Sequence, residues 1–304
     1  MSRSTAERRA DGPDGLVVVD KPAGFTSHDV VAVMRGIART RRVGHAGTLD
    51  PMATGVLLLG LGKATRLLGH LALTEKEYTG TIRLGQATVT DDAEGEVTAR
   101  AGAAGVDRVA LDAGVAALTG DILQIPAKVS AVKIDGERSY RRVLAGEDVE
   151  LPARPVTVRS FTAHEVTELI AGDGTVVTDL AVSVVCSSGT YIRALARDLG
   201  AALGTGGHLT ALRRTRVGPY LLDAARTLDE LRAEPSVLPL GAAAAAAFPR
   251  WDVDGRQAEL LGNGARITTP ELPAGPVAVF GPEDRFIALI EASGERSKSL
   301  AVFT

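Results

Sequence analysis

The spacing of apolar and polar positions predicts strands and helices of ordinary length along most of the chain. A β-branched apolar run over residues 16–19 is typical of a short strand. A helix capped by Thr26 or Ser27 should follow and extend to about Arg39, because apolar side chains recur on one helical face there. The chain is therefore expected to open with a strand, a turn and a helix.

Similar patterns predict further elements downstream. We expect strands over residues 78–84, 156–164 and 175–186, and helices over residues 107–118 and from Tyr191 to about Leu203, the second capped by residues 187–190. The stretch 124–155 is rich in Pro, Lys and Arg and predicts an arm that projects from the sheet, with a helix near 137–145.

Changes in composition suggest three parts of unequal size. Residues 1–13 are polar and aperiodic, which predicts a disordered tail. The main domain is expected over residues 14–246, with the arm at about 124–152. An Ala-rich stretch at 242–247 is either a helix or a linker. The last part, 247–304, should be a small β-rich domain, because its pattern changes to strands near 276–281, 286–292 and 299–303.

The overall composition is that of a globular protein, with 304 residues of which 45% are hydrophobic. No apolar run reaches the roughly 18 residues of a membrane span and no signal peptide is evident, so we expect a cytoplasmic protein without membrane contact. Cys186 is the only cysteine, which excludes an intrachain disulfide. The five histidines show no paired spacing, so no metal site is expected.

Net charge alone argues weakly against a nucleic-acid partner, because the formal value is −3. The arginines are nevertheless grouped along the chain. Each group either neutralises phosphates or forms a solvated surface, and the sequence leaves both interpretations open. The three groups are Arg39 with Arg41 and Arg42, Arg138 with Arg141 and Arg142, and Arg213 with Arg214 and Arg216.

The most informative segment is the glycine-punctuated loop 44–55, Gly-His-Ala-Gly-Thr-Leu-Asp-Pro-Met-Ala-Thr-Gly. Its glycines permit positive φ and close approach to a ligand, and Pro51 biases Asp50 toward an extended conformation. Such a loop can hold one carboxylate still. Asp50 is therefore either a catalytic carboxylate or a turn residue that bonds nearby backbone amides.

Two familiar catalytic patterns are excluded. The run from Gly60 to Thr65 resembles a phosphate-binding loop, but Leu57 and Ala64 stand where that motif requires glycine and Ser or Thr. No Ser or Cys lies in a nucleophile-elbow sequence, so acyl transfer has no support. The remaining candidates for chemistry are Asp50, Tyr78 and Arg193.

Taken in order, the motifs resemble those of the tRNA pseudouridine-55 synthase (TruB) family over most of residues 15–232. The resemblance is carried by Val19-Asp20-Lys21-Pro22-Ala23-Gly24, the loop 44–55, Lys76-Glu77-Tyr78 with Leu84-Gly85, Gln124-Ile125-Pro126, Ser130-Ala131-Val132-Lys133, Arg154-Pro155, the run from Cys186 to Arg193, and Leu212-Arg213-Arg214.

This resemblance implies an α+β fold with a mixed, largely antiparallel central sheet flanked by helices, an inserted RNA-binding arm and a small C-terminal domain of the PUA type. It also implies isomerisation of the T-loop uridine of tRNA, position 55, to pseudouridine without a cofactor. We expect the protein to act as a monomer on the T-arm, with no protein partner required.

The resemblance also assigns roles to residues of the site. Asp50 is implied as the essential carboxylate, and attack on the sugar, attack on the base and removal of a sugar proton all stay open. Arg193 would keep Asp50 ionised and orient it, with Asp92 completing the network. Tyr78 would stack on the flipped base.

Further residues are implied in substrate binding: His45 beside the catalytic loop, Lys21 supporting the pocket, Leu212 packed against the site, and Lys133, Arg141 and Arg142 in the arm. Two departures from the family pattern concern Val89, where an acidic residue is usual, and the arm, where Tyr140 is followed by Arg141-Arg142-Val143-Leu144 rather than an Ala-Arg pair.

Two other functions remain in competition. One is a noncatalytic RNA-binding or RNA-folding protein that uses the same arginine groups. The other is a synthase for another RNA, such as the guide-RNA-dependent relatives that share the catalytic motifs. The set of Asp50, Tyr78 and Arg193 argues against simple binding, because binding alone does not require a carboxylate facing anionic RNA.

Overall fold

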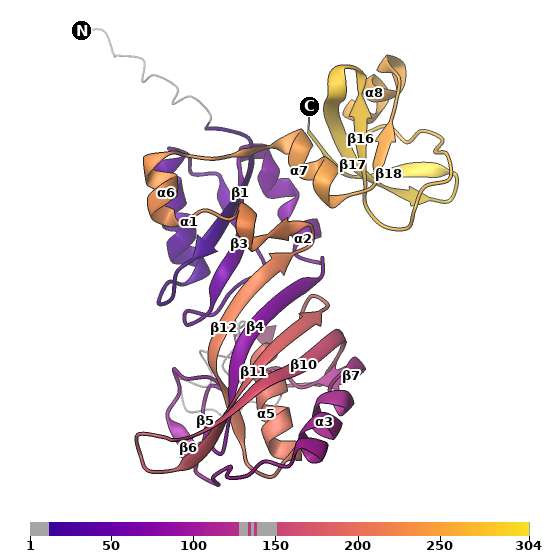
Figure 1. Ribbon diagram of the computed structural model, residues 1–304. Helices are drawn as coiled ribbons and strands as arrows, with labels where there is room; N and C mark the ends of the chain where they lie inside the picture. The colour runs from indigo at the N-terminus through magenta and orange to yellow at the C-terminus, as the bar shows by residue number, and fades with distance from the viewer. Residues whose placement is uncertain (1–11, 128–132, 135–136, 139–150, 304) are drawn as a thin grey trace, which may run out of the picture.

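A twisted, mixed sheet dominates the computed structural model, which describes residues 12–127, 133–134, 137–138 and 151–303 (Figure 1). Eight strands of the described chain follow the order β14 (Leu238–Pro239), β1 (Gly15–Lys21), β3 (Thr54–Leu61), β12 (Gly207–Val217), β4 (Lys76–Leu84), β11 (Val176–Cys186), β10 (Arg154–Ile170) and β7 (Gly120–Gln124). Two more, β2 (Val43–Ala46) and β13 (Tyr220–Leu221), pair with β3 and β12. Among these pairs only β3 with β12 is parallel, so the predicted largely antiparallel sheet is confirmed.

Strand β3 is apolar at every central position because both of its faces are buried. Leu57 and Leu59 belong to the core that also contains Met34 of the first helix, whereas Val56 and Leu58 face the opposite core. Successive side chains of a strand point to opposite faces, so an uninterrupted apolar run is what a doubly covered strand requires.

Three predicted helices, α1 (Ser27–Ile37), α3 (Arg108–Ala117) and α5 (Ile192–Ala202), are present, together with α6 (Leu228–Ala233), which was not predicted from the sequence. Helix α1 is capped by Thr26, whose hydroxyl accepts a hydrogen bond from the backbone of Asp29. Helices α3 and α5 lie together at the β10–β11 end of the sheet, and α6 lies near α1 (Figure 1). The expected capping of α5 by residues 187–190 is wrong, because Tyr191 is the N-cap and no side chain caps the helix.

The C-terminal part forms a second sheet, which confirms the predicted change to short strands. It consists of β15 (Arg250–Asp252), β16 (Val277–Gly281), β17 (Arg285–Ser293) and β18 (Arg296–Val302), with helix α8 (Gly255–Gly262) packed nearby. The Ala-rich stretch is helix α7 (Leu240–Ala247) rather than a linker. Phe280 and Phe286 share a core with Leu16 and Leu58 of the main sheet.

The smaller elements are α2 (Leu68–Leu71) and two short hairpins, β5 (Ala87–Thr88) with β6 (Val97–Ala99) and β8 (Lys133–Ile134) with β9 (Glu137–Arg138). The helix expected near 137–145 is wrong at its first two residues, which form β9. The Asp-Gly pair at 135–136 is a typical two-residue hairpin signal that the helical interpretation overlooked. The rest of that segment lies outside the described residues.

Gly55 is the second residue of β3, the strand that follows the loop of Asp50, and its conformation excludes a side chain. Its φ is +97°, and a Cβ there would lie 2.2 Å from the backbone oxygen of Arg214. Replacing Gly55 with Ala should therefore lower the free energy of unfolding by about 2–4 kcal/mol, from backbone strain and overlap together. Urea denaturation would measure the loss.

Gly174 provides the matched control for this variant. Its φ is +85°, but nothing lies within 4 Å of the position of a Cβ. Gly174→Ala should cost only the left-handed conformation, about 1–2 kcal/mol. Equal losses in the two variants would contradict the proposed overlap with Arg214.

Candidate active site

The Asp50 loop connects β2 to β3 and is bound to α1 by a buried serine. The Ser27 hydroxyl accepts a hydrogen bond from the Leu49 amide at 2.9 Å and donates to the Leu49 carbonyl at 3.2 Å. Leu49 itself is buried in the core. The residue before Asp50 is thus fixed on both sides of its backbone, which supports the prediction of a rigid loop.

Lys21 supports the same loop at Pro51, the residue that follows Asp50. The side chain is fully buried, and its ammonium donates to the carbonyls of Pro51, Phe25 and Pro22 at 3.0, 2.5 and 2.9 Å. Burial lowers the pKa of Lys21 to about 8, and the negative charge of Asp50 partly opposes this shift. Lys21 holds the loop rather than lining the cavity.

Arg214 is a third support, and the sequence did not identify it as one. It is 1% exposed, and its guanidinium donates to the carbonyls of Gly47 at 3.0 Å and Val56 at 2.7 Å. Its neighbours Arg213 and Arg216 form ion pairs with Asp20 and Glu75. The interpretation of this arginine group as a phosphate-binding surface is therefore wrong for Arg214, which is buried, whereas Arg213 and Arg216 form ion pairs but stay 38% and 22% exposed.

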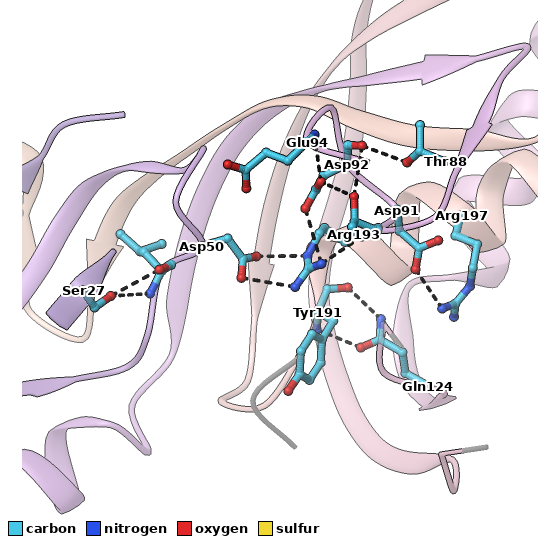
Figure 2. A network of polar contacts seen from close by, with 12 residues as sticks. Ser27, Asp50, Thr88, Asp91, Asp92, Glu94, Gln124, Tyr191, Arg193 and Arg197 are labelled. Atoms are coloured by element: carbon cyan, nitrogen blue, oxygen red, sulfur yellow. Dashed lines mark hydrogen bonds and ion pairs between the residues drawn. The ribbon is translucent and has the colours of Figure 1, made fainter. Parts of the chain in front are cut away.

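Asp50 and Asp92 lie on two sides of one guanidinium (Figure 2). Arg193 approaches Asp50 through Nε and Nη2, at 3.0 and 3.1 Å, and its Nη1 lies 3.3 Å from Asp92 and 2.8 Å from the Thr90 carbonyl. The Arg193 and Asp92 side chains are 5% and 3% exposed, whereas that of Asp50 is 36% exposed. Arg193 therefore binds two carboxylates, the buried one of Asp92 and the accessible one of Asp50.

Opposing influences act on the ionisation of Asp50. Burial raises its pKa, the guanidinium of Arg193 lowers it, and the charge of Asp92 raises it again, with a net increase above the ordinary value. The contact with Arg193 favours the carboxylate form, because Nη2 donates a charge-assisted hydrogen bond to one oxygen of Asp50 and Nε forms an ion pair with the other.

The exposed side of Asp50 borders a cavity of about 270 Å³. Tyr78 from β4 and Leu212 from β12 line it, together with Tyr191 and Arg193 at the start of α5. Burial raises the pKa of Tyr78, so its phenol stays protonated near neutral pH. The cavity thus combines aromatic and aliphatic walls with one accessible carboxylate.

Known proteins and family models match nearly the whole chain, and all of these matches indicate the same family. Family models match residues 35–192 (TruB family pseudouridylate synthase, N terminal domain), 193–237 (tRNA pseudouridylate synthase B C-terminal domain) and 248–304 (tRNA Pseudouridine synthase II, C terminal). A relative from Streptomyces griseus, tRNA pseudouridine synthase B, is 71% identical over 96% of this chain and 97% of its own. The chain belongs to the TruB family.

A relative of the same name from Thermobifida fusca is 60% identical over 95% of this chain and 98% of its own. Among solved structures, an H/ACA RNP bound to a substrate RNA containing 2′-deoxyuridine matches with a TM-score of 0.71 at 23% identity, over 99% of this chain and 92% of that one. A Cbf5-Nop10-Gar1 complex matches with a TM-score of 0.70 at 24% identity, over 100% and 92%. These structural likenesses support the fold alone.

Membership of the TruB family confirms the resemblance, while the roles of the residues remain predictions. The structure brings Asp50, Tyr78, Arg193 and Leu212 to one cavity, with Asp92 behind Arg193. Lys133 lies in β8, and Arg141 and Arg142 lie outside the described residues.

His45 lies in β2, next to the loop but not among the residues that line the cavity. Its ring packs edge-on against His28, with 5.4 Å between centroids. Burial lowers the pKa of His45, and the nearby His28 and Arg214 act in the same direction. A neutral imidazole is therefore expected near pH 7.

Sequence reasoning did not assign Tyr191 and Lys76 to the site, although both line the cavity. Tyr191 lies two positions before Arg193 and could have been found from that spacing across the start of a helix. Lys76 is buried, its ammonium donates to the carbonyls of Ala72 and Thr74, and burial lowers its pKa to about 8.

No group of His, Cys, Asp and Glu side chains in the described part of the chain could hold a metal ion. Within the same residues, no helix is both long and apolar enough to cross a membrane. The absence of a cofactor stays a prediction.

Lys21→Met is expected to change how stability depends on pH. Below pH 8, Lys21 is protonated in both the folded and the unfolded chain. Between about pH 8 and 10.5 only the unfolded chain keeps that proton, so raising the pH stabilises the fold. The free energy of unfolding of the wild type should thus increase relative to the variant by about 1 kcal/mol per pH unit.

Urea denaturation of both proteins from pH 7 to 10 gives this difference, and subtracting the two curves removes the groups they share. A difference that stays constant over the range would contradict the lowered pKa.

Proposed function

We propose that this protein isomerises uridine 55 in the T-loop of tRNA to pseudouridine. The observation that carries the proposal is the partly exposed Asp50 carboxylate, held by Arg193 at the edge of a cavity that Tyr78 also lines. The printed names of the relatives, tRNA pseudouridine synthase B, support the same activity.

The reaction breaks the bond between N1 of the base and C1′ of the sugar, turns the base, and forms a bond between C5 and C1′. An ionised Asp50 is suited to this sequence, because it can stabilise or trap positive charge on the sugar. The geometry is compatible with attack on the sugar, attack on the base, or removal of a sugar proton. Arg193 would orient the carboxylate throughout, since it contacts both of its oxygens.

The cavity walls suggest how the base is held. A uridine that leaves its stack loses contacts with its neighbours, and an aromatic face returns part of that energy. We assign this stacking to Tyr78, which is 9% exposed and lines the same cavity as Asp50. Leu212 closes the cavity with an apolar surface, and Lys21 keeps the loop in place from behind.

The T-arm of tRNA is the proposed partner, bound by one copy of the chain without another protein. The assembly of Asp50, Tyr78 and Arg193 from a single chain supports a monomer. Exposed Arg39, Arg41 and Arg42 are suited to phosphates, since no carboxylate in the described residues pairs with them. A tRNA substrate is consistent with action in the cytoplasm.

We further propose a catalytic domain over residues 14–246, containing the arm at about 124–152, and a PUA-like RNA-binding domain over 247–304. The separate four-stranded sheet and the family model matched to residues 248–304 support the second boundary.

The decisive experiment is to incubate the pure protein with an unmodified tRNA transcript and to map pseudouridine at single-nucleotide resolution. Modification at the T-loop uridine supports the proposal. A protein that binds or refolds tRNA without modifying it would instead be a noncatalytic RNA-binding protein, and modification of a different RNA only would indicate another synthase.

A further inference from the structure

The root of the arm is attached to the helix that carries Arg193. Gln124 ends β7 and pairs with Arg154 of β10, so the chain leaves and re-enters the sheet at this point. The Gln124 side chain accepts from the Tyr191 amide at 2.8 Å and donates to the Tyr191 carbonyl at 3.1 Å (Figure 2). These two bonds fix the start of α5 to the root of the arm.

A second attachment lies six residues further along the chain, at Arg197 of α5. Arg197 donates from Nη2 to the carbonyl of Ile125 at 2.8 Å, and its Nη1 lies 3.2 Å from the carboxylate of Asp91. Its Nε donates to the adjacent Asp198 at 2.8 Å. Each nitrogen of this guanidinium thus has a partner within the protein, which argues against a role in binding RNA phosphate.

Asp91 connects this contact to the catalytic network. Its side chain is 13% exposed and its φ is +59°, a left-handed conformation that costs energy in any residue with a side chain. The next residue is Asp92, which Arg193 holds. Arg193 and Arg197, four positions apart on α5, therefore bind consecutive carboxylates of one loop.

We propose that Arg197 is a positioning residue that couples the root of the arm to the Asp50–Arg193–Asp92 network. The inference rests on the proposed function. A shift at Ile125 would be transmitted through Arg197 to Asp91 and so to Asp92, which sets the orientation of Arg193. Small displacements of catalytic groups matter because a misplacement of about 1 Å can cost 10²-fold in rate.

Arg197→Met should lower kcat about tenfold and leave the KM for tRNA within twofold, because it disturbs geometry rather than RNA contacts. Asp91→Asn should have a similar effect, and Asn also tolerates the left-handed backbone at that position. When Arg197→Met and Asp91→Asn are combined, kcat should lie within twofold of that of either single variant, because both substitutions interrupt the same chain of contacts. Asp198→Asn is the matched control and should keep wild-type kcat.

Single-turnover and steady-state assays, with melting temperatures measured alongside, separate the possible outcomes. Wild-type kcat in a folded Arg197→Met protein overturns the coupling, as does a double variant whose losses multiply. A change in KM alone also overturns it, because it would assign Arg197 to RNA contact. If Arg197→Met fails to fold, Asp91→Asn decides by its own kcat. A wild type that forms no pseudouridine would instead refute the proposed function itself.

Discussion

Asp50→Asn should abolish pseudouridine formation while leaving tRNA binding and the fold intact. Asn matches the size of Asp but carries no charge, so it cannot stabilise or trap positive charge on the sugar. The side chain is 36% exposed, and its replacement leaves the buried pair of Arg193 and Asp92 in place. We expect turnover to fall by about 10⁴-fold or more, measured by pseudouridine mapping.

Asp179→Asn is the appropriate control, because Asp179 pairs with Arg83 away from the cavity. This variant should modify tRNA at the wild-type rate. Gel-shift affinity within twofold of wild type would show that Asp50→Asn still binds substrate. Normal turnover by Asp50→Asn would refute the assignment of the essential carboxylate.

Arg193→Met should have the largest effect on stability. Removing the guanidinium leaves Asp92 buried without its counter-charge, and breaking a buried ion pair in this way typically costs about 3–5 kcal/mol. Activity should be lost as well, since Asp50 loses the group that orients it. Chemical denaturation and turnover assays on the same preparation measure both effects.

Two further variants test whether the unpaired charge of Asp92 causes the loss of stability in Arg193→Met. Arg193→Lys keeps the charge, but a single ammonium cannot reproduce the planar contact with two carboxylates, so an intermediate loss is expected. Adding Asp92→Asn to Arg193→Met should recover part of the stability, because it removes the unpaired charge. No recovery in that double variant would argue that lost packing, rather than charge, explains the destabilisation.

Local sequence patterns predicted several of the elements that carry the site, but not β12, which carries Leu212, or β2, which carries His45. The apolar run at 16–19 predicted β1, and the alternating pattern at 78–84 predicted β4. The hydrogen bonds between Ser27 and Leu49 support the expectation that the glycine loop holds Asp50 in a fixed position. Glycine and proline limit backbone conformations over a few residues, so their effects can be read from neighbours alone. The ordered motifs then located Arg193 and Tyr78, which lie far away in the chain.

The sequence could not reveal contacts whose partners are distant. Consecutive strand residues face opposite sides of a sheet, so Arg213 reaches Asp20 while Arg214 turns into the interior toward Gly47. A group of arginines adjacent in sequence therefore gives no common surface here. Arg197 was overlooked for the same reason, since Asp91 is more than a hundred positions away.

The buried cluster that contains Phe280 and Phe286 together with Leu16 and Leu58 bears on whether the C-terminal sheet is dispensable. Leu58 belongs to the strand that leaves the Asp50 loop, and all four side chains are nearly inaccessible to solvent. A truncated protein that lacks the second sheet would expose part of this hydrophobic cluster to water. The C-terminal sheet consequently covers part of the main hydrophobic core. Truncated versions of the enzyme should therefore tend to aggregate.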